Sequence, residues 1–168
     1  MPSTSSFDDS QEIKPLPKVL ADQFPGKWKV QGKGLFTWSV FRVYRMALHA
    51  CGVFNPEKPY ALDLNYLRNV SAEQIAQASV QEMQRISGVS EAQAQSWGEQ
   101  RLAILPDVRL GDRLIGVFSP GTGVWFCNAD RALGVIQEPE FAAAFSAIWL
   151  DPQTRAPKLR EHLLGLAG

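Results

Sequence analysis

The sequence predicts an α+β fold in which an antiparallel β-sheet carries a layer of helices on one side. Segments rich in aromatic and β-branched residues, which are typical of strands, gather in two blocks at 27–67 and 112–137. Two stretches with helical periodicity separate these blocks, and two more follow the second block. Because strands and helices come in blocks rather than in alternation, the sheet is expected to be antiparallel.

Turn signals divide the two blocks into the individual strands. Gly32-Lys33-Gly34 is expected to separate the first two strands, and Asn55-Pro56 precedes the third. Pro120-Gly121-Thr122-Gly123 is expected to join two strands of the second block as a hairpin. The expected strands are Lys27–Gly32, Leu35–Ala50, Tyr60–Leu67, Asp112–Ser119, Gly123–Asn128 and Ala132–Gln137.

Capping residues mark the expected helices. Ser71 is a favourable N-cap with Gln74 three residues later, which is the spacing of a capping box, and Gly88 closes the helix. Ser90 repeats the N-cap signal for a second helix. Pro139 suits the first turn of a third helix, which carries an apolar stripe. The second, third and last helices are expected at 90–102, 138–151 and 156–164.

Length and composition indicate one globular domain behind a polar tail. A chain of 168 residues with 45% hydrophobic and 20% charged residues is typical of a single soluble domain. Residues 1–22 are expected to be a flexible polar tail, and residues 23–168 the domain. The tail lacks a signal-like apolar run, and no stretch approaches the ~18 apolar residues of a membrane span. A cytoplasmic location follows, or a periplasmic one if Met1 was added to a trimmed chain.

Charge and residue spacing argue against nucleic-acid and metal binding. The 17 basic and 17 acidic residues leave no surplus of positive charge for phosphate contacts. The cysteines and histidines lack the spacing of metal ligands, so neither a metal nor another cofactor is expected. Cys51 and Cys127 are expected to be free buried thiols, with a disulfide as the alternative, and His49 and His162 are expected to be structural.

The segment 35–50 is the most informative part of the sequence. Strand alternation places a cation and a phenol, Arg42 and Tyr44, on an apolar face that also carries Phe36, Trp38 and Met46. A guanidinium group beside a phenol can hold a carboxylate through charge-assisted hydrogen bonds. The alternative is that Arg42 reaches out to the sheet edge and Tyr44 simply fills the core.

Several short strings, in this order and spacing, resemble the bacterial chalcone isomerase-like proteins. The resemblance extends from Trp28 to Gly165 and implies an open-faced β-sandwich with a cleft between the sheet and the helices. In plant enzymes of this family the cleft closes a flavanone ring from a chalcone, whereas related non-catalytic members bind fatty acids through Arg and Tyr. The strings include Gly32-x-Gly34, Phe41-Arg42-Val43-Tyr44, Tyr66-Leu67-Arg68, Leu105-Pro106-Asp107-Val108, Gly111-Asp112-Arg113-Leu114 and Ile148-Trp149-Leu150.

The same resemblance implies that most of the catalytic groups of the isomerases are replaced. The catalytic Arg and Thr of the sheet correspond to Phe36 and Tyr44, and the helix Tyr and Asn fall near Ile75 and Glu82. Neither Phe36 nor Ile75 can polarise a carbonyl or transfer a proton. Efficient cyclisation of a chalcone is therefore not expected.

These observations predict a non-catalytic protein that binds a small, mostly apolar ligand such as a fatty acid or an aromatic acid. Arg42 and Tyr44 are the expected anchors, and Phe36, Trp38 and Met46 the expected wall. One alternative is an isomerase or intramolecular lyase that uses Tyr44 and Arg42 on another substrate. A second is an interaction protein whose cleft is collapsed. The side chains expected to fill such a cleft are Phe36, Trp38 and Trp97.

Overall fold

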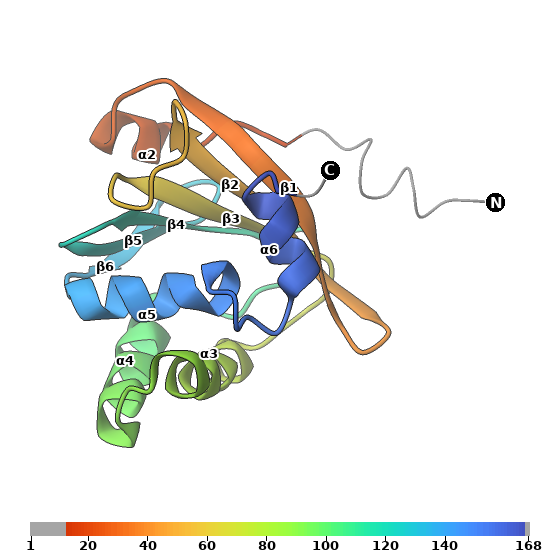
Figure 1. Cartoon of the computed structure of the whole chain (residues 1–168), viewed down its shortest axis with the longest axis vertical. Coiled ribbons are helices and arrows are strands. Elements are labelled where there is room, and N and C mark those ends of the chain that lie inside the picture. Colours follow the sequence, from red (N-terminus) through yellow and green to blue (C-terminus); the bar gives the residue numbers. More distant parts are fainter. Residues whose placement is uncertain (1–12, 167–168) are drawn as a thin grey trace.

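The strands form one six-stranded antiparallel sheet in sequential order, in a computed structural model that describes residues 13–166 (Figure 1). Each strand pairs with its neighbour in the sequence, so the predicted antiparallel α+β architecture is confirmed. The strands are β1 Trp28–Trp38, β2 Phe41–Cys51, β3 Tyr60–Tyr66, β4 Arg113–Ser119, β5 Gly123–Cys127 and β6 Ala132–Ile136.

Most of the helices cover one face of this sheet (Figure 1). Helices α3 (Ala72–Ser87) and α4 (Glu91–Ile104) connect β3 to β4, and α5 (Pro139–Leu150) follows β6. Helix α6 (Pro157–Leu163) contacts β1, whereas the short helix α2 (Lys18–Gln23) lies on the opposite side of the sheet. The main core therefore lies between the sheet and the layer formed by α3, α4 and α5.

The predicted capping residues start and end the two central helices. Ser71 Oγ accepts a hydrogen bond of 3.1 Å from the backbone N–H of Gln74, and the Gln74 side chain completes the capping box. Gly88 ends α3 in the left-handed conformation, with φ of 66°. Ser90 Oγ accepts a matching bond of 3.1 Å from Gln93 N–H at the start of α4. These local signals are strong because each satisfies backbone groups that the helix leaves unpaired.

The prediction of one long strand over 35–50 is wrong. Strand β1 continues through Gly32 and Gly34, and the chain reverses at Ser39 and Val40, where Ser39 takes a positive φ of 56°. The glycines lie in a strand because α6 packs directly on them. A Cβ at Gly32 would overlap the carbonyl oxygen of His162, and one at Gly34 would lie 2.7 Å from Leu159 Cδ1.

The contact between Gly32 and α6 leads to a stability prediction. We expect Gly32→Ala to lower the free energy of unfolding by about 3 kcal/mol, because its methyl group meets backbone that can move only if α6 is displaced. Urea unfolding followed by circular dichroism measures this loss. Lys29→Ala, at an exposed position of the same strand, is the control and should change little. Equal effects of the two substitutions would contradict the close packing of α6 on β1.

Residues 13–22, which were expected to belong to the flexible tail, pack against the sheet instead. Leu20 is only 2% exposed and joins a second apolar cluster with Ala61, Ile115, Val117 and Cys127. Trp28 Nε1 donates a 2.8 Å hydrogen bond to the carbonyl oxygen of Phe24, which holds the end of this segment. The domain thus begins earlier than expected. Residues 1–12, the rest of the expected flexible tail, lie outside the described residues.

A buried ionic network joins this segment to the sheet. The Asp63 carboxylate accepts hydrogen bonds from Arg113 Nη2 at 2.8 Å and from His49 Nε2 at 2.9 Å. Arg113 Nη2 also donates to the carbonyl oxygens of Lys14 and Pro15, at 3.0 and 2.9 Å. Burial raises the pKa of Asp63, but the bonds from His49 and Arg113 outweigh it and hold that pKa below its ordinary value.

The cysteines lie in different environments. Cys127 is buried near this network and Cys51 is exposed at the end of β2, and both thiols are free in the part of the chain that the structure describes. Burial raises the pKa of Cys127 to about 12, so its thiol is protonated and unreactive at neutral pH. The expectation of a buried thiol is therefore wrong for Cys51.

Candidate ligand-binding site

A cavity of about 660 Å³ lies between the sheet and the helices α3 and α5. Its volume is within the roughly 300–1,000 Å³ typical of small-molecule sites. The expected filler Trp97 is buried away from the cavity, where its indole N–H donates to Glu138 at 3.1 Å. The cavity contradicts the alternative of a collapsed cleft. Its sheet side consists mainly of apolar and aromatic side chains, namely Phe36, Tyr44, Leu62, Leu64, Tyr66, Leu114, Phe118 and Phe126.

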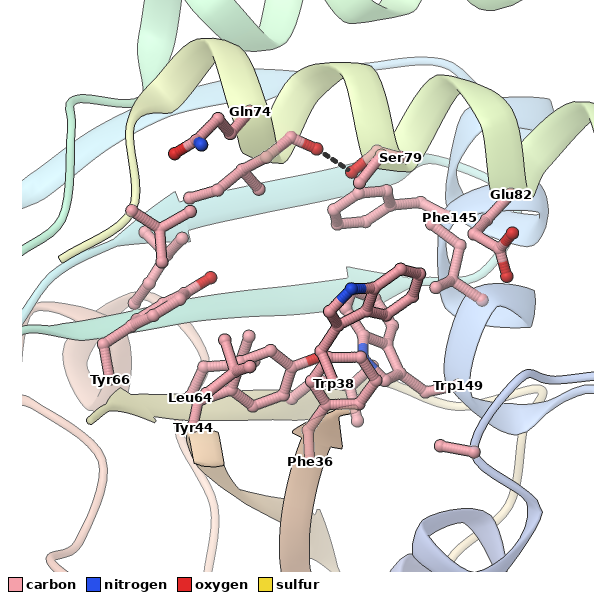
Figure 2. A pocket seen from close by; sticks show the side chains of 18 of the residues that line it. Phe36, Trp38, Tyr44, Leu64, Tyr66, Gln74, Ser79, Glu82, Phe145 and Trp149 are labelled. Atoms are coloured by element: carbon pink, nitrogen blue, oxygen red, sulfur yellow. Dashed lines mark hydrogen bonds between the residues drawn. The ribbon is translucent and has the colours of Figure 1, made fainter. Parts of the chain in front are cut away.

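Two phenols line the sheet side of the cavity. The Tyr44 ring stacks on Phe36 with centroids 4.7 Å apart, and its hydroxyl accepts a 2.8 Å hydrogen bond from Trp149 Nε1. Figure 2 shows the Tyr66 hydroxyl directed toward the interior of the pocket. Burial raises the pKa of Tyr44 above its ordinary value, and burial raises the pKa of Tyr66 to about 12 against the opposing charge of Arg101. Both phenols therefore remain protonated at neutral pH and can donate hydrogen bonds.

Arg101 brings a buried positive charge to the cavity wall. It comes from α4, is 3% exposed, and has its guanidinium carbon 6.0 Å from the ring centroid of Phe145. Burial lowers the pKa of Arg101 to about 10, and the group is still charged at neutral pH. Its Nε and Nη1 have no hydrogen-bond partner among residues 13–166. Buried donors of this kind normally have acceptors, because leaving them unmatched costs about 1–3 kcal/mol or more.

The predicted pair of anchors is separated by a β-bulge. Phe36 pairs with Tyr44 and Thr37 with Arg42, so Val43 is an extra residue on β2 that has no partner of its own on β1. Beyond the bulge the faces exchange, and Phe41 and Val43 line the cavity whereas Arg42 is exposed outside it. The expectation that Arg42 shares the face of Tyr44 is therefore wrong.

The other predicted site residues are placed as follows. Phe36, Trp38 and Tyr44 line the cavity, as Figure 2 shows. Met46 is 1% exposed within the core but does not line the cavity. Arg101 was not among the predicted site residues. The sequence does contain a signal for it, because Arg101 follows Trp97 at helical spacing on the same buried stripe of α4. A charged residue in an apolar stripe marks either a buried ion pair or a polar site.

The residues that the family resemblance sets at the catalytic positions of the isomerases also line the cavity. Phe36 and Ile75 present apolar side chains there. Glu82 holds Arg85 at 2.8 Å and Arg155 at 3.1 Å, and the hydrogen bond from Arg85 is the main reason that its pKa is lowered. The cavity thus combines a buried cation, protonated phenols and mainly apolar walls.

We infer that the cavity has a mouth beside the tip of the β1–β2 hairpin, where two of its aromatic lining residues are partly exposed. Trp38 and Phe41 both line the cavity and are about half exposed, at 53% and 50%. Arg155 lies 5.1 Å from the centroid of the Trp38 ring, and Arg68 lies 4.4 Å from that of Phe41. Each distance is short enough for a cation–π contact. The mouth therefore combines aromatic rings with positive charge.

The sheet, its helix layer and the mainly apolar cavity between them define an open-faced β-sandwich with an internal ligand-type site. The chain belongs to the chalcone isomerase-like family, whose sequence profile matches residues 25–165. An uncharacterized protein of Haemophilus influenzae is 29% identical over 140 residues, which cover 82% of this chain and 68% of that protein.

A solved structure shares the fold. The fatty-acid binding protein AtFAP1 of Arabidopsis thaliana superposes with a TM-score of 0.66 at 9% sequence identity, covering 82% of this chain and 86% of that one. At this identity the likeness shows the fold alone. Within residues 13–166, no cluster of three or more His, Cys, Asp or Glu side chains could hold a metal ion, and no helix has the length and hydropathy needed to cross a bilayer.

Proposed function

We propose that the protein binds a small, mostly apolar molecule with one carboxylate head, such as a fatty acid, without converting it chemically. The observation that carries this proposal is Arg101, a buried cation with unmatched N–H donors in the wall of a mainly apolar cavity. A carboxylate can accept two parallel hydrogen bonds from a guanidinium group, and such charge-assisted bonds are strong where water is excluded.

The rest of the cavity fits the two parts of such a ligand. Tyr66 lies near enough to Arg101 for that charge to oppose the rise of its pKa, so its neutral hydroxyl can provide a second donor for the head group. The apolar side chains that lead from there to Trp38 and Phe41 at the mouth provide a surface for the hydrocarbon tail. The ligand that names the Arabidopsis protein with the same fold belongs to this chemical class.

The replaced catalytic positions support binding without chemistry. Phe36 and Ile75 line the cavity where the isomerases carry polar groups, and neither can stabilise an oxyanion or move a proton. The raised pKa values of Tyr44 and Tyr66 make both phenols weak acids at neutral pH. A substrate would therefore meet donors that hold it, but no group tuned for proton abstraction among these residues.

Calorimetric titration with decanoate tests the proposal. The affinity for decanoate should depend on pH in a way that is set by the charge of Arg101. We expect binding at pH 7 and a loss of affinity as pH rises through about 10, because Arg101 then loses the charge that holds the carboxylate. Bound carboxylate favours charged Arg101, so the midpoint in the complex should lie above that of the free protein. The ligand itself stays ionised throughout, since carboxylic acids titrate near pH ~4.

Decanol is the matched control ligand, with the same chain and no carboxylate. It is expected to bind more weakly than decanoate at pH 7, and its affinity should not fall as Arg101 is deprotonated. Equal affinities for decanoate and decanol at pH 7 would contradict the assignment of a carboxylate site.

A further inference from the structure

The tip of the β1–β2 hairpin exposes a group of large apolar side chains. Val40 is 86% exposed and Leu110 is 66% exposed, beside the half-exposed Trp38 and Phe41. Val40, Phe41 and Leu110 border one shallow surface depression, so these side chains are contiguous. Figure 1 shows the hairpin turn projecting beyond the body of the fold. We call Trp38, Val40, Phe41 and Leu110 the hairpin patch.

Arginines flank the hairpin patch. Arg42 borders the same depression, and Arg68 stacks on Phe41. Arg155 stacks on Trp38 and shares the carboxylate of Glu82 with Arg85, while Asp151 is a second acid near Arg85. Arginine side chains therefore flank an apolar tip, although the chain as a whole has a formal net charge of zero.

An acid, Asp112, lies near Leu110. Its carboxylate accepts a 2.9 Å hydrogen bond from the backbone N–H of Arg109, whose side chain carries the opposite charge. This acid reduces the positive charge on one side of the patch. Arg68 on Phe41 and Arg155 on Trp38 are the cations that contact the aromatic rings of the patch directly.

We propose that the hairpin patch docks on an anionic lipid surface. Tryptophan and phenylalanine are suited to the interface between headgroups and hydrocarbon, and an exposed valine at a projecting tip can enter the acyl boundary. Each arginine near an anionic surface strengthens binding by about fivefold. A narrow apolar projection flanked by arginines is complementary to such a surface, whereas a protein partner would need a matching hollow of its own.

The position of the patch connects docking with the cavity. Trp38 and Phe41 belong both to the patch and to the cavity mouth, so a docked molecule would place that mouth at the lipid. A fatty acid could then pass between the membrane and the cavity without exposing its tail to water. This role as an entry route rests on the proposed function, whereas docking itself does not.

Vesicle co-sedimentation of the whole chain tests the proposal. Vesicles of phosphatidylcholine alone are compared with an equimolar mixture of phosphatidylcholine and phosphatidylglycerol. We expect binding to the mixed vesicles, weaker binding to the neutral ones, and a decrease with added salt. Val40→Asp should reduce binding to the mixed vesicles by about tenfold or more, because it puts a charge where an apolar side chain enters lipid.

Val53→Asp is a closely matched control. Val53 is 91% exposed and lies beyond the opposite end of β2, so it receives the same change away from the hairpin patch. Equal losses for the two variants would overturn the proposal, as would equal binding of the wild type to neutral and mixed vesicles. Sedimentation that shows a dimer for the wild type and a monomer for Val40→Asp would assign the patch to self-association instead.

Decanoate titration without vesicles keeps the two proposals separate. Val40→Asp is expected to retain the affinity of the wild type for decanoate, and Arg101→Leu is expected to retain vesicle binding. Decanoate binding without vesicle binding would overturn docking and leave the proposed function standing. Vesicle binding without decanoate binding would support docking and contradict fatty-acid transfer as its role.

Discussion

Replacing Arg101 by leucine is expected to weaken decanoate binding by about a hundredfold and, at the same time, to stabilise the protein. The affinity falls because the carboxylate loses its charged donors in a site that excludes water, a loss of ~3 kcal/mol. Stability is expected to rise by about 1–3 kcal/mol, because a buried guanidinium with unmatched donors gives way to an apolar side chain of a kind that fits the core.

The opposite signs of the two effects make this result diagnostic. Calorimetry with decanoate gives the affinity, and urea unfolding without ligand gives the stability. A residue needed mainly for folding would lose both together, so a marked fall in stability would contradict the anchor role of Arg101.

Arg42→Ala is the matched control for Arg101. Arg42 is exposed on the other face of the bulged strand, and we expect its replacement to change decanoate affinity by less than about twofold. A large loss of affinity on replacing Arg42, with little effect at Arg101, would place the carboxylate outside the cavity.

Asp63→Asn is expected to cause a large loss of stability, about 3 kcal/mol, comparable with that of Gly32→Ala. Asp63 is fully buried, and its carboxylate compensates the charge of Arg113, whose side chain is only 8% exposed. Without the carboxylate, the charged guanidinium of Arg113 remains buried beside a neutral amide. Arg113 also binds the carbonyl oxygens of Lys14 and Pro15, so the contact of this segment with the sheet is weakened as well. Urea unfolding at neutral pH measures the loss.

The pH dependence of stability follows from the lowered pKa of Asp63. A carboxyl whose pKa is lower in the folded state stabilises the protein fully above its ordinary pKa, about 4, and loses that contribution as pH falls through the folded value. The free energy of unfolding of the wild type should therefore decrease as pH falls below about 5. That of Asp63→Asn should decrease less over the same range.

Lys18 and Asp22 form a control ion pair on the same side of the sheet. Their contact is 3.1 Å, but the two side chains are 88% and 66% exposed. We expect Asp22→Asn to change stability by less than about 0.5 kcal/mol, because water already solvates both charges. Comparable losses of stability for Asp22→Asn and Asp63→Asn would contradict the view that the Asp63 network stabilises the protein because it is buried.

The sequence by itself determined most of the helices and strands, but not the short helix α2 or the point at which β1 turns into β2. The capping box of Ser71 and Gln74, the glycine at 88 and the two blocks of strand-forming residues act locally, and neighbours in the chain are sufficient for them. The order of those blocks was also enough to predict the antiparallel sheet and its helix layer.

The tertiary structure alone decided which side chains reach the cavity. One extra residue at Val43 exchanges the faces of β2, and strand periodicity cannot reveal a bulge that depends on pairing with β1. For the same reason Gly32 and Gly34 resembled a turn, because only the packing of α6 explains two glycines within a strand. Arg101 lies far along the chain from Tyr44 and Tyr66, and it meets the cavity only when α4 folds over the sheet.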